Sequence, residues 1–417
     1  MKLLLAKYKY PFLLVAIGLV WIVLLNYILQ IKWQTFVFPD SESYLLASEN
    51  LYLFHKTDII RPSLIAAING FPLLFGFSKI SLFAWNTFVN LIAWLAIIQL
   101  VYRIISKFAT QKIAFFSTLI YLFSVGSFII VFQVLSETVF ALMLLLSLYY
   151  FQKYFESKAI KYISIGISLL VLSVLIKPVS LGLVAILLLI FFFKLKKVVF
   201  NKWSLVIYFS LFILIFHMYS MKKNYGDFTI SYIDSFTYYN YLGTRADCLK
   251  NDMEFKQCDN ARYRYFNTLS LAEGKKEAFR DMKMQVTTNA VNLAKAYFTN
   301  IFYNTWRGSG YFYEFKNVKE TPYFETVKTL FRGISKLQNI IYTLFGVIVS
   351  LYFLSRNRME INFIKIVSLF VLYIFLISGI SSDQGDRFHI VFYPLVIILI
   401  ACFLKLKSTN LKWIKKS

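Results

Sequence analysis

The stretch PFLLVAIGLVWIVLLNYILQI, residues 11–31, decides the fold class of this chain. It carries no charged side chain, and about 18 apolar residues are enough for an α-helix to cross the hydrocarbon core of a bilayer. Comparable runs follow at 80–102, 113–132, 134–152, 160–176, 178–194, 203–220, 336–355, 361–380 and 388–404. We therefore expect an all-α polytopic membrane protein with about ten transmembrane helices.

The composition of the whole chain also indicates lipid as its main environment. Hydrophobic residues make up 59% and charged residues 16%, whereas soluble proteins carry about a quarter charged residues. The 45 Lys and Arg exceed the 21 Asp and Glu, which gives a formal charge of +24. These cations fall in short clusters between apolar runs and do not form one soluble basic surface. We therefore predict membrane lipids, and no nucleic acid, as partners.

The first apolar run is expected to stay in the mature protein. Lys2, Lys7 and Lys9 precede it, as in a secretory signal, but the run is long and residues 30–34 offer no small-residue cleavage site.

The charges of the short loops predict that both termini lie in the cytoplasm. Lys and Arg concentrate in cytoplasmic loops, and here they cluster in alternate connections. The residues assigned to that side are Arg103, Lys107, Lys112, Lys153, Lys158, Lys161, Lys194, Lys196, Lys197, Lys202, Arg356, Arg358 and the tail from 405 to 416. We expect a multi-pass protein of the cytoplasmic (inner) membrane, with its active site facing the periplasm or outside.

This topology divides the chain into three parts. Residues 1–220 form an N-terminal transmembrane module whose first outer loop, 32–79, includes a membrane-surface or re-entrant helix. Residues 221–335 form a mainly helical outer-face domain, and 336–417 supply the last spans and a basic tail. The short cytoplasmic loops, without a P-loop or dinucleotide-binding glycine pattern, leave no place for a nucleotide-binding domain.

One amphipathic helix is predicted within the outer-face domain. Its apolar residues recur at three- or four-residue steps, a spacing that suits a helix packed on the bundle better than one lying on lipid. They are Phe279, Met282, Val286, Ala290, Leu293, Tyr297 and Ile301.

Neither the cysteines nor the histidines indicate a metal site. Cys248 and Cys258 lie close together in the outer domain, where a disulfide and two free thiols both remain open. His55, His217 and His389 lie far apart, without a metal-ligand spacing. We predict no structural metal; a divalent cation at the outer carboxylates would be compatible with the residues, but no motif indicates it.

Two carboxylates at the outer face are candidates for chemistry. Asp40 follows Pro39 and either caps a surface helix or serves as a base desolvated near the membrane. Glu137 starts the fourth span, where it is either stabilised by the helix dipole or held by a functional partner.

Cations are expected on the same face. Topology brings Lys177 and Arg387 there, and a phosphate-bearing substrate would need such groups. A snorkelling interfacial charge is the alternative for each, and it is the better interpretation for Lys177. Arg61 is a further outer cation.

In these motifs the chain resembles the GT-C class of membrane glycosyltransferases. It looks most like bacterial relatives of the dolichyl-phosphate-mannose protein mannosyltransferases and the lipid A aminoarabinose transferases. The motifs are Asp40-Ser41-Glu42-Ser43-Tyr44, Arg61-Pro62, Ser136-Glu137-Thr138, Leu175-Ile176-Lys177-Pro178, Gly385-Asp386-Arg387-Phe388 and Tyr393-Pro394.

The resemblance implies a sugar donor linked to a polyprenyl phosphate, used on the outer face by a hexosyl- or pentosyltransferase. It makes Asp40 the base that deprotonates an acceptor hydroxyl, and Glu137 a residue that shapes the site. It assigns substrate binding to Glu42, Tyr44, Arg61, Lys177, Asp386 and Arg387. The acceptor, a lipid, glycan or protein, would be selected by residues 221–335.

The chain also departs from the family. The paired acids of the protein mannosyltransferases are separated here by Ser41, and no Trp-Trp-Asp motif is present, which argues against an asparagine-linked oligosaccharyltransferase. Two other functions stay open. An O-antigen-type polymerase would carry two arginine-rich outer loops, and a transporter or flippase for a lipid-linked glycan would place ionisable residues near the bilayer midplane.

Overall fold

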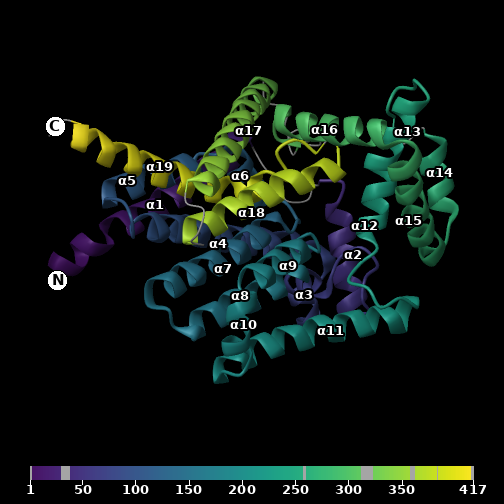
Figure 1. The fold of residues 1–417 in the computed structure, drawn as a ribbon, viewed down its shortest axis with the longest axis horizontal. Coiled ribbons are helices and arrows are strands. Elements are labelled where there is room, and N and C mark those ends of the chain that lie inside the picture. Colours follow the sequence, from purple (N-terminus) through teal and green to yellow (C-terminus); the bar gives the residue numbers. More distant parts are fainter. Residues whose placement is uncertain are drawn as a thin grey trace.

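The computed structural model of the protein describes residues 2–29, 38–256, 260–310, 323–356, 362–382 and 384–414. The secondary structure of these residues is helical, apart from an isolated antiparallel bridge between Ser309 and Gly385. The N- and C-terminal ends lie at one end of the molecule, and the helices between residues 233 and 288 lie at the other (Figure 1).

Six of the described helices are long and apolar enough to cross a membrane. These are α1 (Lys2–Leu29), α4 (Lys79–Ile105), α7 (Glu137–Ser157), α11 (Leu205–Tyr225, with the turn from Lys202 before it), α17 (Phe324–Ser355) and α18 (Phe363–Ile377), which reaches spanning length together with the 3-10 turn to Ile380. Each coincides with a predicted span, so the all-α membrane fold is confirmed. Helix α17 begins well before the predicted span at 336–355, and its first turns fall within the segment assigned to the outer domain.

The remaining predicted spans are shorter or bent. A bend of 65° separates helix α5 (Gln111–Leu122) from the segment that follows it, formed by α6 (Val125–Ile129) and η2 (Ile130–Phe132). The two parts count as a seventh span only if they are taken together. The shorter apolar helices are α8 (Ile160–Val174), α9 (Ser180–Ile190), and η7 (Ile390–Phe392) continued by α19 (Tyr393–Ile414). Ten spans with both termini inside therefore stay a prediction.

The buried core lies where α7 packs against α4, α8 and α18. Large side chains from these helices, among them Trp94, Phe140, Phe151 and Phe370, are almost completely buried. Helix α11 packs mainly on α8 and exposes Phe212 and Phe216, as expected for a helix that faces lipid. A basic turn built from α10 (Phe192–Val199) and η3 (Lys202–Ser204) precedes it.

The described part of the segment predicted as the first outer loop, residues 38–78, is a packed helical hairpin. Helix α2 (Ser41–Tyr52) packs on α3 (Ser63–Gly70), which η1 (Phe71–Phe75) continues. The Ser48 hydroxyl donates to the Ala66 carbonyl at 3.1 Å, and Gly70 lies so close to Ser48 that a Cβ would collide with it. The Ile65 amide donates to the Leu175 carbonyl at 3.2 Å. The loop is thereby fixed to the end of α8, next to Lys177.

The region between α11 and α17 contains short helices and one longer pair. These are α12 (Ile233–Thr237), the π-helical turn η4 (Tyr238–Gly243), α13 (Thr244–Lys250), α14 (Ala261–Thr268), α15 (Leu271–Thr288) and α16 (Ala290–Trp306). Ser270 and Glu273 form a capping box at the start of α15. A buried ion pair joins Arg262 and Asp281 at 2.8 Å.

The single amphipathic helix predicted around 279–301 is in fact two helices, α15 and α16, separated at Asn289. The packing prediction holds only for α16, where Ile301 is buried. In α15 the polar Asp281 and Gln285 are buried, and Phe279 is 65% exposed. The ion pair with Arg262 explains this reversal, because it gives the buried carboxylate a partner.

Cys248 is buried and forms no disulfide among the described residues; its sulfur accepts a hydrogen bond from the Asn260 amide at 3.3 Å. Cys258 lies outside the described residues, so the predicted choice between a disulfide and two thiols stays open.

Candidate functional site

Five charged residues from five separate segments meet in one cluster, which we call the ionic cluster. Asp40 precedes α2, Arg61 precedes α3, and Glu137 is the first residue of α7. Lys177 lies between α8 and α9, and Arg387 lies between α18 and η7. The sequence analysis named all five, and the fold brings them together from positions up to hundreds of residues apart in the chain.

Asp40 lies between two guanidinium groups. Its Oδ2 is 2.7 Å from Nη1 of Arg387 and 3.2 Å from Nη2 of Arg61, and 37% of its side chain is exposed. Asp40 occupies the predicted N-cap position of α2, but its side chain makes no capping hydrogen bond, so a side-chain cap does not account for this residue. Burial alone would raise the pKa of Asp40, but Arg387 and Arg61 outweigh it and hold that pKa below its usual value.

Glu137 lies behind Asp40 and is fully buried. Its Oε1 accepts hydrogen bonds from Nε of Arg387 at 2.7 Å and from Nζ of Lys177 at 3.0 Å. A buried carboxylate needs such partners, because removing an ion from water costs several kcal/mol, on the order of the whole gain from a good pair. Glu137 is therefore placed to hold Arg387 and Lys177.

Arg61 is fixed along the side of Tyr44. Its guanidinium lies 4.1 Å from the centre of the Tyr44 ring, its Nη1 donates to the Tyr44 hydroxyl at 3.2 Å, and its Nε donates to Ser43 at 2.9 Å. The Tyr44 hydroxyl also shares a hydrogen bond of 2.7 Å with Ser136, the residue before Glu137. Tyr44 is 2% exposed, so it forms the buried side of the cluster, on which Arg61 packs.

Two of the residues predicted to bind substrate lie apart from the cluster. Glu42 is exposed on the first turn of α2 and makes no contact with the other charged groups among the described residues. Asp386 is fully buried, and Gly126 lies against its carboxyl group. Burial raises the pKa of Asp386 to about 8, which leaves it largely neutral at pH 7.

Three neutral residues of the site were missed by the sequence analysis. Arg387 stacks on the Phe38 ring at 4.8 Å, and its Nη1 donates to Oε1 of Gln384 at 3.0 Å. The Gln133 side-chain oxygen accepts a hydrogen bond from the Phe38 backbone amide at 3.0 Å, which fixes the backbone just before α2. Gln133 carried a signal, because it is a polar residue between two predicted spans.

The charge balance of the cluster favours an anion. Among the described residues of the cluster, three cations face two carboxylates, so these five groups together carry one positive charge when all are ionised. Asp40 is the acid that solvent can reach, and both of its cations lie beside it. This arrangement can receive a phosphate on Arg387 and Arg61 and leave a carboxylate next to it.

The chain was compared with known proteins. No protein-family model matches it, and no curated protein matches its sequence. Among solved structures, it is similar to the archaeal oligosaccharyltransferase AglB from Archaeoglobus fulgidus, solved with an inhibitory peptide and a dolichol-phosphate. Sequence identity is 12% and the TM-score is 0.47. The match covers 99% of this chain and 52% of AglB, so this chain spans about half the length of that protein.

That likeness concerns the fold alone. At this identity and TM-score, it carries no argument about the activity of this chain. The function of the ionic cluster is therefore argued from its own side chains.

The donor groups of the cluster do not suit a metal ion. Among the described residues, no three His, Cys, Asp or Glu side chains are placed to hold one. Asp40 and Glu137 both face guanidinium or ammonium groups, which a divalent cation would have to displace. Two of the histidines already have hydrogen-bond partners. His389 is buried and hydrogen-bonded to Thr343 and Asn339, and His217 is hydrogen-bonded to the Ile230 carbonyl.

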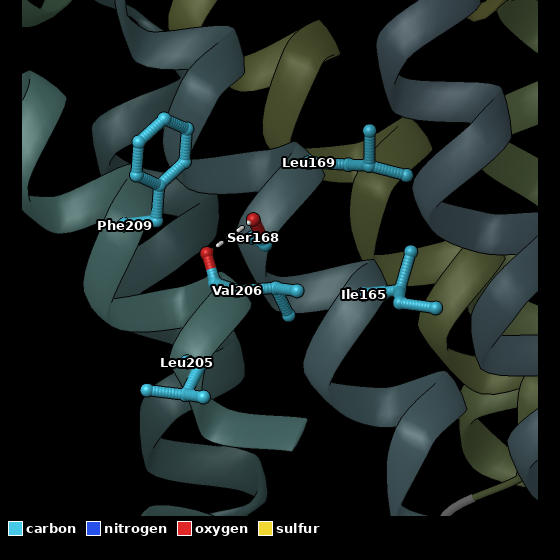
Figure 2. A pocket seen from close by; sticks show the side chains of 6 residues that line it. All are labelled: Ile165, Ser168, Leu169, Leu205, Val206 and Phe209. Carbon is cyan, nitrogen blue, oxygen red and sulfur yellow. Dashed lines mark hydrogen bonds between the residues drawn. The ribbon is translucent and has the colours of Figure 1, made fainter. Parts of the chain in front are cut away.

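A hollow of about 390 Å³ between α8 and α11 lies away from the cluster. Figure 2 shows its lining of Ile165, Ser168, Leu169, Leu205, Val206 and Phe209. Its one polar side chain, Ser168, already donates to the Val206 carbonyl at 2.9 Å. The hollow therefore offers no group for a phosphate or a sugar.

Proposed function

We propose that the chain is a glycosyltransferase that moves a sugar from a polyprenyl-phosphate-linked donor to a lipid, glycan or protein acceptor. The observation that carries this proposal is the position of Asp40, a partly exposed carboxylate between Arg61 and Arg387. Transfer from a sugar phosphate needs a base for the acceptor and cations for the leaving group, and little else.

The donor's phosphate takes the place beside the two arginines. Arg387 and Arg61 present guanidinium groups, which suit the bidentate recognition of phosphate oxygens. Lys177 adds a third positive charge behind them. The polyprenyl chain stays in the membrane, which accounts for an enzyme without a nucleotide-binding domain.

The reaction is a displacement at the anomeric carbon. Asp40 takes the proton of the acceptor hydroxyl as the acceptor oxygen bonds to that carbon. The bond from the carbon to the phosphate oxygen breaks, and its electron pair stays on the phosphate. The leaving polyprenyl phosphate gains one negative charge, which Arg387 and Arg61 stabilise. Asp40 then passes its proton to water.

The two arginines adjust Asp40 to this task. Without substrate, they hold the pKa of Asp40 below its usual value, which makes it a weak base. A phosphate that binds them neutralises part of their charge, so the pKa of Asp40 rises when a base is needed. Glu137 keeps Arg387 and Lys177 in place and acts as a positioning residue.

The enzyme would work at the outer face of the cytoplasmic membrane. The positive-inside pattern favours ten spans with both termini inside, which places the cluster outside. Residues 221–335 then form an outer domain that selects the acceptor.

The test compares cells that carry the wild-type chain, a deletion, Asp40→Asn or Glu49→Gln. Polyprenyl-phosphate-linked sugars and surface glycans are measured by mass spectrometry. Asp40→Asn should reduce transfer by about 10²–10⁴-fold, so that donor lipid accumulates and one glycan lacks a sugar, as in the deletion.

Glu49→Gln is the matched control, because Glu49 lies on α2, the helix that begins directly after Asp40, and pairs with Lys79 at 3.3 Å, away from the cluster. It should behave like the wild type. Normal glycans in the Asp40→Asn strain, with altered glycans in the deletion, would remove Asp40 from the chemistry. A transporter would instead leave the donor lipid on the cytoplasmic side in the deletion and tolerate Asp40→Asn.

A further inference from the structure

Arg387 lies in the connection between α18 and η7, and this connection is bonded to a different part of the chain. Helix α16 lies along it, and the 3-10 turn η6 (Ser378–Ile380) packs on that helix. We infer that α16 holds Arg387 in its working position, with Asn304 as the positioning residue. This inference rests on the proposed function, because it assigns a support to the phosphate-binding arginine.

Asn304 uses both ends of its amide on the connection. Its Nδ2 donates to the carbonyls of Ser378 at 2.9 Å and Ser381 at 2.8 Å. Its Oδ1 accepts the backbone amide of Gln384 at 3.3 Å. Asn304 is fully buried, so water cannot replace these bonds.

Gln384 carries the link onward to the ionic cluster. Its side-chain oxygen accepts from Nη1 of Arg387 at 3.0 Å, and the same Nη1 is 2.7 Å from Asp40. Asn304 thus fixes the backbone of the residue whose side chain orients the guanidinium. It touches neither the cluster nor a substrate bound there.

One face of α16 repeats this mode of attachment. Tyr297 and Asn300 lie on the same side as Asn304 and donate to the carbonyls of Leu376 at 2.6 Å and Gly379 at 3.0 Å. At the end of α16, Asn339 donates to the carbonyls of Asn304, Thr305 and Arg307 at 2.7–3.0 Å.

Two further contacts bind the rest of the connection to the same region. Arg245 donates to the Ser382 hydroxyl at 2.6 Å, and Ser309 forms the backbone bridge with Gly385. The segment that carries Arg387 is therefore anchored mainly by residues between 245 and 309, in the part of the chain that would select the acceptor. The position of the phosphate-binding arginine then depends on that part of the chain.

The test measures binding of farnesyl phosphate to the full-length protein in detergent by isothermal titration calorimetry. Asn304→Ala should weaken binding about tenfold, because it frees the backbone at Gln384. Gln384→Ala should have a similar effect. It is the second variant because Gln384 is only half-buried and its loss leaves the Asn304 bonds to Ser378 and Ser381 intact.

Asn292→Ala is the control, since Asn292 lies on the same helix and its amide bonds to Asn289. It should bind like the wild type. In an Arg387→Gln background, Asn304→Ala should add less than about a twofold loss, because its effect passes through Arg387. The inference would be overturned if Asn304→Ala weakened binding as much in the Arg387→Gln background as in the wild type. Wild-type affinity of Gln384→Ala would overturn it as well.

The two proposals fail in different ways. Wild-type binding by Arg387→Gln counts against the proposed function and this inference together. Loss of binding with Arg387→Gln, but not with Asn304→Ala, counts against the inference alone. Melting temperatures of all variants show whether a loss of binding reflects unfolding.

Discussion

At the scale of the residue, the ionisation of Asp40 is set by its two neighbours. Its carboxylate lies beside Arg387 and Arg61, which hold its pKa below its usual value despite burial. A carboxyl group with a lowered pKa stays ionised when the pH falls to the usual pKa of an aspartate. It takes up a proton only at a lower pH.

This predicts the acid limb of the pH–rate profile. Because kcat/KM reports ionisation of the free enzyme, it should stay level from pH 7 down to about pH 4. In Arg61→Gln one of the cations is lost, the pKa of Asp40 rises, and the limb should move to higher pH. The measurement is kcat/KM for the lipid-linked donor at a series of pH values.

Lys79→Gln is the control for this profile, since Lys79 pairs with Glu49 on α2, the helix that begins directly after Asp40. Its acid limb should coincide with that of the wild type. A wild-type limb near pH 6, or no movement in Arg61→Gln, would show that another group controls the rate.

The sequence did not show which of two nearby charged residues faces the ionic cluster. Asp386 and Arg387 are adjacent, yet one is buried against Gly126 and the other reaches Asp40. Asp40 and Glu42 are two positions apart at the start of a helix, where successive residues turn by about 100°, so they point to different sides. Spacing alone did not show which of each pair faces the site.

At the scale of the element, the turn before Arg387 depends on a glycine. Gly385 has a φ of +58°, which disfavours other residues, and a Cβ there would collide with the Gly308 carbonyl. Gly385→Ala should therefore break the bridge to Ser309, displace Arg387 and lower transferase activity at least about tenfold.

Gly226→Ala separates the effect of φ from the effect of position. Gly226 ends α11 with a φ of +89°, and no atom lies within 4 Å of its Cβ position. It should lose about 1 kcal/mol of stability and keep its activity. If Gly385→Ala keeps as much activity as Gly226→Ala, measured at matched protein amounts, the turn does not position Arg387.

Which helices exist was largely predictable, and where they break was not. Length and hydrophobicity located α4, α7 and α18, because lipid selects for long apolar runs. The 65° bend after α5 leaves no mark in the periodicity. At the break between α15 and α16, the Asn289 side chain donates to the Ala246 carbonyl and to Gln285, and such tertiary contacts are not visible in periodicity either. Gln384 and Phe38 gain their roles only from contact with Arg387, so no local pattern marked them.

At the scale of the whole molecule, the side of the membrane that holds the cluster can be measured. Lys283→Cys and Lys112→Cys place single thiols at exposed positions, in a background whose natural cysteines are replaced by serine. A membrane-impermeant maleimide should label Lys283→Cys in intact cells and Lys112→Cys only after permeabilisation. The reverse pattern would invert the topology and place the cluster in the cytoplasm.

The charge surplus of the ionic cluster has a kinetic consequence. A lipid-linked sugar donor is a phosphodiester with one negative charge, whereas the polyprenyl phosphate left after transfer is a monoester with up to two. Under the proposed function, the excess positive charge counted on the described residues of the cluster would hold the spent carrier more tightly than the fresh one. Under the proposed function, release of the spent carrier would therefore be slowed relative to release of the donor. Flux through the enzyme would follow the rate at which the cell recycles its lipid carrier.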